Sequence, residues 1–327
     1  MRKRQHDMII LLQEEEPPYI AMPPLFPAFE PLGLKHKDYF RRYADLIELN
    51  SDYSFANLLV WNTNEQATVS QLNDMAVLIY PNYNNPDDSL CLVLGEGDLL
   101  LPSIATVLAS GKAQNVDLVP DSLFDATRLT EHGLRAEPDR DSYDYVYLAK
   151  ALAAAETSHY RHMRRGASVF KERHEGHLEI QVEIDAPSEA VVAEIMEITE
   201  QWGLSRYGAK VYEEGIAIER ALKHLHELDL KLAVLLSDGR AIGFIIYEYI
   251  GKKDDTVLIH FEKNANHNSL GHYLKKSFFD RIVAHNGKEI IYINYEQDLG
   301  IEGLRTIKLS LNPYTFNEVS TIYRSAD

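Results

Sequence analysis

Three acidic and two basic residues lie close together between Asn294 and Lys308, directly after an apolar run that is typical of a buried strand. Because side chains alternate along a strand, Asn294, Glu296 and Asp298 are predicted to share one face at the strand's C-terminal end, where α/β sheets form ligand crevices. A carboxylate can accept a proton from an attacking amine, and Arg305 or Lys308 can stabilise an oxyanion, as ester or thioester aminolysis requires. The alternative is a network of ion pairs that caps a helix and fixes the final strand.

A second group of candidate residues lies in the strand-like segment at residues 256–264. His260 and Glu262 are two positions apart, so a regular strand places both on one face. They are predicted to bind substrate in the same crevice. A buried, hydrogen-bonded histidine is the alternative interpretation of His260.

The segment from His159 to His177 is basic within an acidic chain. In a helix, Arg161, Arg164 and Arg165 share one face through their i, i+3 and i+4 spacing. Arg164, Arg165 and Lys171 are predicted to hold donor phosphates, and a solvated connecting helix is the alternative. The four histidines of this segment lack the spacing of a typical zinc site, so no metal is predicted.

The elements that must position these residues alternate between strands and helices in the second half of the chain. The pattern predicts a strand at 177–185, helices at 186–203 and 211–228, and a hairpin at 231–251. A strand at 256–264, a helix at 270–287, a strand at 289–298, a short helix at 301–310 and a last strand at 318–324 follow. Asp238-Gly239 is a favoured tight-hairpin dipeptide. A mixed α/β sheet with helices on its faces would bury these elements. The first half has a similar pattern.

Composition limits the class of protein. The apolar runs are far shorter than the ~20 residues of a membrane-spanning helix, so no integral membrane association is predicted. A formal net charge of −17 opposes long-range attraction to nucleic acid and anionic lipid, although the basic segment could act locally. The single cysteine, Cys91, fits a reducing environment, and a cytoplasmic location is expected.

Residues 292–313 resemble the C-terminal signature of the family named for the catalytic domain of phosphatidylglycerol lysyltransferases, N-x-E-x-D-x-G-x-x-G-L-R-x-x-K-x-S-x-x-P. The pattern is matched at Asn294, Glu296, Asp298, Gly300, Gly303, Leu304, Arg305, Lys308, Ser310 and Pro313. Residues 51–61, SDYSFANLLVW, resemble the family's N-terminal S-x-x-x-F-x-N-x-x-x-W stretch. The segment HYRHMRRGASVFKERH is similar to its basic segment.

This resemblance implies a fold of two tandem GNAT-like domains, the fold of acyl-CoA N-acyltransferases. The sequence pattern divides the chain into a flexible tail (1–19), an N-terminal domain (20–158), a basic connecting helix (159–177) and a C-terminal domain (178–327). The resemblance implies transfer of an aminoacyl group from aminoacyl-tRNA to an amine or hydroxyl acceptor. Glu296, Asp298 and Arg305 are then the predicted catalytic residues, and Asn294 and Lys308 bind substrate.

The sequence departs from the family at several positions. Tyr295 stands where Arg is frequent, Leu311 where Tyr is frequent and Met163 where Lys is frequent. The multi-span membrane domain of the large lysyltransferases has no counterpart here. A coenzyme A loop would be glycine-rich, whereas residues 263–276 contain only Gly271. Coenzyme A is therefore the less favoured donor. A lipid acceptor is not predicted, because a net charge of −17 is poorly suited to an anionic bilayer.

Three functions are consistent with these features. The preferred one is an aminoacyl- or acyltransferase that uses aminoacyl-tRNA, or a coenzyme A thioester, and a small-molecule acceptor. The alternatives are a non-catalytic GNAT-like module that binds a ligand or partner, and an acetyl-CoA-dependent N-acetyltransferase. The acceptor, the transferred group and the oligomeric state are left open.

Overall fold

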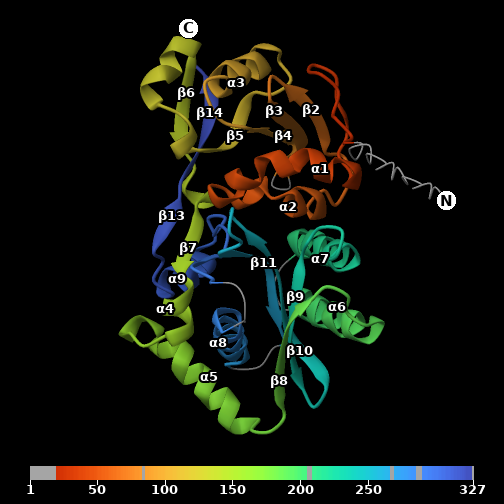
Figure 1. Ribbon diagram of the computed structural model, residues 1–327, viewed down its shortest axis with the longest axis vertical. Coiled ribbons are helices and arrows are strands. Elements are labelled where there is room, and N and C mark those ends of the chain that lie inside the picture. Colours follow the sequence, from red (N-terminus) through yellow and green to blue (C-terminus); the bar gives the residue numbers. More distant parts are fainter. Residues whose placement is uncertain (1–19, 83–84, 205–207, 266–268, 285–288, 326–327) are drawn as a thin grey trace, which may run out of the picture.

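The computed structural model describes residues 20–325 except 83–84, 205–207, 266–268 and 285–288 (Figure 1). Two halves are stacked along the longest axis, with the N-terminal elements in the upper half of the view and the large sheet in the lower half. The predicted flexible tail, residues 1–19, lies outside the described residues.

The upper half contains two antiparallel sheets. The first has the order β1-β2-β3-β4 and is formed by β1 (Glu30–Pro31), β2 (Thr68–Leu72), β3 (Met75–Asn82) and β4 (Asn85–Leu94). The second has the order β5-β14-β6 and is formed by β5 (Asn115–Pro120), β14 (Val319–Arg324) and β6 (Leu134–Pro138). The helices of this half are α1 (Lys37–Phe40), α2 (Phe55–Val60) and α3 (Leu100–Ala109).

The lower half is built on a mixed sheet in the order β13-β7-β12-β11-β10-β9-β8. Its strands are β7 (Asp144–Leu148), β8 (Leu178–Ile184), β9 (Lys231–Ser237), β10 (Arg240–Ile250), β11 (Thr256–Asn264), β12 (Tyr292–Asn294) and β13 (Thr315–Asn317). The helices are α4 (Ala149–Ala154), α5 (Arg161–Arg173), α6 (Glu189–Leu204), α7 (Gly208–Lys223), α8 (Leu270–Val283) and α9 (Glu302–Ser310). The predicted α/β fold class is confirmed.

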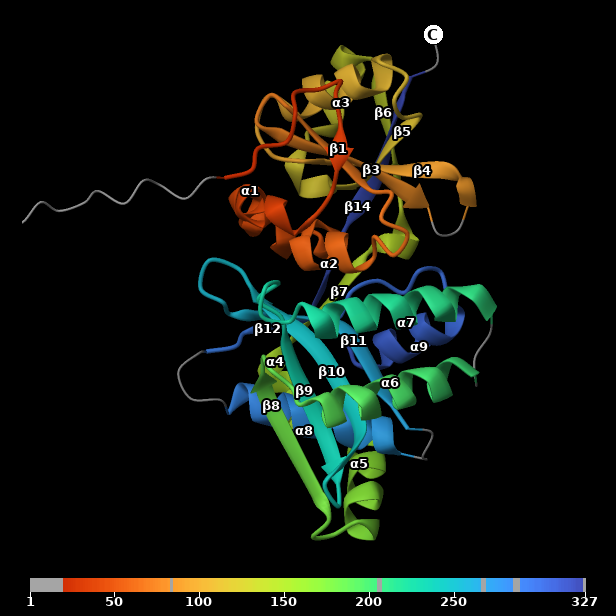
Figure 2. The same cartoon turned by 90° about the vertical axis from the view of Figure 1, so that its right-hand side faces the viewer.

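Helices cover both faces of this sheet, and this explains why its central strands are mostly apolar. Along β9, Leu232 and Val234 pack in a core with α6 and α7, whereas Ala233 and Leu235 pack in a core with α8. The first core continues into the upper half, where α2 lies directly above α7 (Figure 2). Trp61 contacts Phe261 across this junction, with ring centroids 5.6 Å apart.

The predicted hairpin is present between β9 and β10. Asp238 and Gly239 have φ angles of +50° and +81°. Positive φ at both central residues is the requirement of a type I′ turn, which glycine and aspartate tolerate better than most residues.

Two irregularities open the centre of the sheet. β11 and β12 pair in parallel at only three positions, Thr256 with Tyr292, Val257 with Ile293 and Leu258 with Asn294. β11 then continues to Asn264 paired with β10 but not with β12. In the pairing of β11 with β10, the register shifts so that His260 is bulged. β11 and β12 are therefore splayed beyond the pair of Leu258 with Asn294.

The two halves exchange strands. β7 comes from the N-terminal part of the sequence but pairs with β12 and β13, and β14 lies between β5 and β6. The exchange links the halves in both directions. The division of the chain at residues 158 and 178, and the tandem relation of the halves, stay predictions.

Candidate functional site

The strand that carries the signature residues ends earlier than its sequence pattern indicates. β12 stops at Asn294, whose Oδ1 accepts a hydrogen bond from Glu296 N at 2.9 Å in an Asx turn. Glu296 has a φ of +54°, so strand alternation does not continue past it. The predicted common face of Asn294, Glu296 and Asp298 is therefore wrong, and the two carboxylates reach different partners.

Glu296 lies beside His260 at the junction between the halves. Its Oε1 lies 3.0 Å from His260 Nδ1 and accepts a hydrogen bond from Asn57 Nδ2 at 3.0 Å. On the other side of the imidazole, His260 Nε2 lies 3.0 Å from Glu248 Oε1. Glu248 Oε1 also accepts from the Ser54 hydroxyl. Residues from α2, β10, β11 and the end of β12 thus form one buried network.

His260 is positively charged in this network. Its side chain is only 1% exposed, and burial alone would lower its pKa. The flanking carboxylates of Glu248 and Glu296 outweigh burial and raise the pKa of His260 to about 9. Both ring nitrogens therefore carry a proton at neutral pH. His260 is therefore the buried, hydrogen-bonded histidine of the alternative interpretation, and its predicted role in substrate binding stays a prediction.

More acidic groups lie next to this network. Asp144 accepts hydrogen bonds from Ser51 N at 2.8 Å, from Ser51 Oγ at 2.7 Å and from Asn294 Nδ2 at 2.9 Å. Burial raises the pKa of Asp144 to about 6, although these donors oppose it. Burial, Asp144 and Glu296 raise the pKa of Asp52 above its ordinary value. Asn294 therefore binds the protein's own carboxylate, and its predicted role toward substrate stays a prediction.

Asp298 lies in a separate ion-pair network with α9. Its side chain is fully buried, and Arg305 donates to it twice, from Nε at 2.9 Å and from Nη2 at 2.7 Å. Tyr145 Oη donates at 2.6 Å, Gly300 N at 2.9 Å and Arg140 Nη1 at 3.3 Å. Burial alone would raise the pKa of Asp298, but these donors lower it to about 2.

A carboxylate with so many donors and so low a pKa is a poor general base at neutral pH. Arg305 is likewise occupied, because it also donates to Asp141 at 2.6 Å. The geometry of Asp298 and Arg305 therefore favours the alternative interpretation, in which the network fixes α9. Their catalytic role stays a prediction for substitution to test.

Lys308 connects α9 to the Glu296 network. Its buried ammonium donates to Tyr295 O and to Glu296 O, the latter at 3.2 Å. Burial lowers the pKa of Lys308 to about 8, although Glu296 and Asp144 oppose the shift. A lysine with such a pKa can donate a hydrogen bond or exchange a proton near neutral pH. Lys308 thus lies against the backbone of Tyr295 and Glu296, and its predicted role in substrate binding stays a prediction.

Glu262 does not share a face with His260, so that prediction is wrong. The bulge at His260 reverses the alternation of β11, and Glu262 points toward α8, where its Oε1 accepts from Lys275. The other oxygen, Oε2, is buried without a hydrogen-bond partner among the described residues. A one-residue irregularity has no signature in the apolar pattern of residues 256–264.

The predicted basic helix is α5, and it borders a groove. A cavity of about 530 Å³ lies between α5 and α8, and its lining includes Arg164, Lys171, Lys276 and Arg281. Arg164 also donates to Thr157 O at 2.8 Å. Arg165 is exposed, and its role stays a prediction. Met163, at a position where the family often has Lys, is buried in the core beneath α5.

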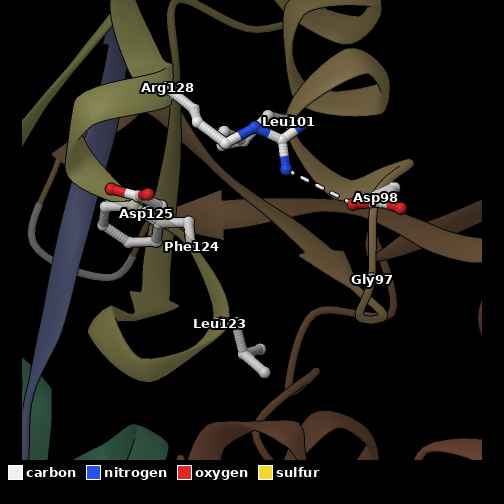
Figure 3. Close-up of a pocket in the computed structure, with 7 residues that line it drawn as sticks. All are labelled: Gly97, Asp98, Leu101, Leu123, Phe124, Asp125 and Arg128. Atoms are coloured by element: carbon white, nitrogen blue, oxygen red, sulfur yellow. Dashed lines mark hydrogen bonds and ion pairs between the residues drawn. The ribbon is translucent and has the colours of Figure 1, made fainter.

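A smaller cavity lies in the upper half, apart from the signature residues (Figure 3). It has a volume of about 180 Å³ and is lined by Gly97, Asp98, Leu101, Leu123, Phe124, Asp125 and Arg128. Arg128 crosses it to Asp98, with Nη1 3.3 Å from Oδ1. This side-chain pair closes part of the cavity.

Some residues of the networks were not predicted from the sequence. Asn57 and Ser51 belong to the recognised S-x-x-x-F-x-N-x-x-x-W stretch, so a signal for them was present, although it gave no role. Glu248, Tyr145 and Arg140 carried no local signal, because only the fold brings them to His260 and Asp298. Across the described ranges, no three His, Cys, Asp or Glu side chains are grouped so as to hold a metal ion.

Together these features define an α/β protein with splayed central strands and a charged junction between interlocked halves. The chain belongs to the family described as phosphatidylglycerol lysyltransferase, C-terminal, whose model matches residues 43–323. The predicted family membership is confirmed. Among the helices in the described part of the chain, none has the length and apolar character needed to cross a bilayer.

Solved structures share this fold. A conserved protein of unknown function from Bacteroides thetaiotaomicron VPI-5482 is 22% identical, with a TM-score of 0.75 over 90% of this chain and 99% of that one. The C-terminal domain of a putative lysylphosphatidylglycerol synthetase from Agrobacterium fabrum is 12% identical, with a TM-score of 0.59 over 88% and 92% of the two chains. L-PGS from Bacillus licheniformis is 12% identical, with a TM-score of 0.59 over 89% of this chain and 92% of that one. No curated protein sequence matches the chain significantly.

Proposed function

We propose that this protein transfers an aminoacyl group from aminoacyl-tRNA, or an acyl group from a coenzyme A thioester, to an amine or hydroxyl of a small acceptor. Membership of the lysyltransferase family supports a transferase. The observation that carries the proposal is the position of Glu296, whose side chain is 16% exposed where β11 and β12 part. Asp298, by contrast, is fully buried.

Glu296, Lys308 and His260 would each have a separate role in acyl transfer. Glu296 accepts the proton of the acceptor as its nitrogen or oxygen bonds to the carbonyl carbon. Lys308 stabilises the oxyanion, and the bond to the donor oxygen or sulfur then breaks, with the leaving group taking up a proton. His260, charged and buried behind Glu296, holds that carboxylate in position.

The groove between α5 and α8 would hold the donor's phosphates. Arg164 and Lys171 face Lys276 and Arg281 across it, and one acid, Asp280, also lines it and pairs with Lys276 at 2.6 Å. A local excess of cations can bind a phosphate backbone even in an acidic protein. Aminoacyl-tRNA is the preferred donor, because the segment 263–276 has only one glycine, Gly271, with which to form a coenzyme A loop. Packing alone explains this glycine, since a Cβ added to it would lie 3.1 Å from Asn264 Nδ2.

A second candidate function is a non-catalytic module that binds a ligand or partner. The closed Asp298 and Arg305 network favours it, because two signature residues are engaged with each other rather than with an open site. It predicts ligand binding without transfer from any donor.

A single-turnover assay would separate these functions. The protein is mixed with a pool of tRNAs charged with labelled amino acids, or with labelled acetyl-CoA, and with a panel of amines and alcohols. Label should move to an acceptor, and E296Q should slow transfer at least about a hundredfold without a large change in melting temperature. E302Q, which alters an exposed glutamate on α9, is the matched control. Absence of transfer from every donor would leave the binding module.

A further inference from the structure

The small cavity of the upper half has no part in the proposed transfer, since it lies apart from the signature residues (Figure 3). Its volume is about 180 Å³. Pockets for cofactors and drug-sized ligands usually enclose roughly 300–1,000 Å³, so this cavity is too small for coenzyme A or a nucleotide. A ligand that fills it must be a smaller molecule than either.

The walls of this cavity carry charges of both signs. Arg128 belongs to the 3-10 helix Ala126–His132, and Asp98 lies opposite it, just before α3. Asp125 also lines the cavity, and its Oδ1 accepts hydrogen bonds from Thr127 N at 2.9 Å and from Thr127 Oγ1 at 2.7 Å. These bonds hold the Asp125 carboxylate at the wall. The cavity therefore presents one guanidinium and two carboxylates to a ligand.

The ion pair that spans the cavity is weak enough for a ligand to replace. Arg128 Nη1 lies 3.3 Å from Asp98 Oδ1, and Arg128 Nε lies 3.9 Å from Glu131 Oε2. The side chains of Arg128 and Asp98 are 44% and 94% exposed. Exposed ion pairs of this kind contribute little to stability. A carboxylate that binds the guanidinium through two parallel hydrogen bonds would therefore displace Asp98 readily.

The remaining lining of the cavity is mostly apolar. Leu101, in the first turn of α3, is buried, and Leu123 and Phe124 are half-buried. All three pack in the core of the upper half, which holds this apolar wall in place. Figure 3 shows the Arg128 side chain above Phe124 and Leu123, so the charged and apolar groups face the same space. An apolar side chain of a ligand would gain by covering the apolar wall.

Together these groups select a molecule that carries both charges. An anion without an amine would bind Arg128 but would also meet the carboxylates of Asp98 and Asp125. An amine without a carboxylate would leave Arg128 facing a second cation. A zwitterion avoids both conflicts, because its carboxylate pairs with Arg128 and its ammonium with the two aspartates.

We propose that this cavity binds a free α-amino acid with an apolar side chain of about the size of leucine. The carboxylate of the amino acid binds Arg128, its ammonium binds Asp98 and Asp125, and its side chain covers the apolar wall. This site is separate from the proposed function and does not depend on it.

Calorimetric titration of the intact protein with L-leucine and three analogues tests the proposal. 4-Methylpentanoate lacks the amine, 3-methylbutylamine lacks the carboxylate, and glycine lacks the side chain. L-Leucine should bind at least roughly tenfold more tightly than each analogue. R128Q should weaken leucine binding at least about tenfold. D98N should weaken it at least about threefold, and it changes a side chain that is too exposed to be needed for folding.

R135Q is the matched control, because Arg135 is 48% exposed and pairs with Glu137 on β6, outside the cavity. It should leave leucine binding unchanged, and so should E296Q in the other half. No binding of leucine at millimolar concentration, or an analogue that binds as tightly as leucine, would overturn the proposal. Leucine binding that survives both R128Q and D98N, or that is lost in E296Q, would overturn it as well.

Discussion

At the scale of single residues, the charged junction depends on a histidine held between two carboxylates. His260 contributes hydrogen bonds to Glu248 and Glu296 only while both ring nitrogens are protonated. Its pKa is about 9 when folded, against 6.5 as the ordinary value. The stability it contributes is therefore complete below pH 6.5 and is lost as the pH rises through 9.

We therefore expect the free energy of unfolding to fall by roughly 1–2 kcal/mol between pH 6.5 and 8. Asp144 has a raised pKa of about 6 and therefore titrates below this pH window. Lys308 has a lowered pKa of about 8, so it makes the free energy of unfolding rise with pH, mainly above the window. Urea unfolding at several pH values measures the change. E248Q removes one of the carboxylates that raise the pKa of His260, so its profile should be flatter. A wild-type profile that is level across the window would contradict the assignment.

The second prediction at this scale concerns Asp298. D298A leaves Arg305 and Arg140 without their buried partner, and we expect a loss of roughly 3–5 kcal/mol in the free energy of unfolding. D280A is the control, because that half-exposed carboxylate pairs with Lys276 one helical turn away and should change stability by less than about 0.5 kcal/mol. Chemical denaturation measures both variants. A D298A protein as stable as D280A, but without transfer activity, would restore Asp298 as a catalytic residue.

At the scale of elements, local patterns predicted most of the helices and strands of the lower half. The hairpin at Asp238 and the amphipathic helix α8 follow from turn chemistry and periodicity, which act within a few residues. The end of β12 was missed because Asn294 forms an Asx turn where strand alternation was expected to continue. The bulge at His260 could not be predicted, because it depends on the pairing of β11 with β10. These two irregularities decide where Glu296, Asp298 and Glu262 point, so the identities of the site residues were easier to predict than their geometry.

The contact between α5 and α8 gives a prediction about helices. A Cβ added at Gly166 would lie 2.5 Å from His272 Cδ2, so G166A should force the helices apart or displace that ring. We expect a loss of roughly 1–3 kcal/mol in the free energy of unfolding. G303A is the matched helical control, since no atom lies within 4 Å of its added Cβ, and it should gain up to about 1 kcal/mol. Thermal and urea unfolding of both variants check the contrast. Equal stability would show that α5 and α8 adjust freely.

At the scale of the whole molecule, the exchanged strands make each half depend on the other. The β7 strand fills the sheet position between β12 and β13, and β14 is the central strand of the three-stranded sheet above. Such long-range pairing leaves no trace in local periodicity, so the sequence indicated two halves but not their interlocking.

This arrangement gives a prediction about fragments. Residues 178–327 expressed alone would lack β7, and residues 1–158 would lack β14, so neither fragment should unfold cooperatively by itself. Mixed during refolding, the two should recover a cooperative transition when the first fragment is extended to residue 177. Circular dichroism and heat-induced unfolding report the result. A fragment of residues 178–327 that folds alone would show that β7 is dispensable and would support the predicted domain division.

The position of β14 also has a consequence for how the protein forms in the cell. The ribosome delivers β5 and β6 early, but the strand that joins them is made after every other strand described here. Domains generally fold as units during synthesis, beginning at the N-terminus. We expect the upper half to leave the ribosome without its central strand β14, and to stay unfolded in part until β14 is made. During that time the edges of β5 and β6 are unpaired and can aggregate. Biogenesis of this protein should therefore depend on chaperones that bind nascent chains.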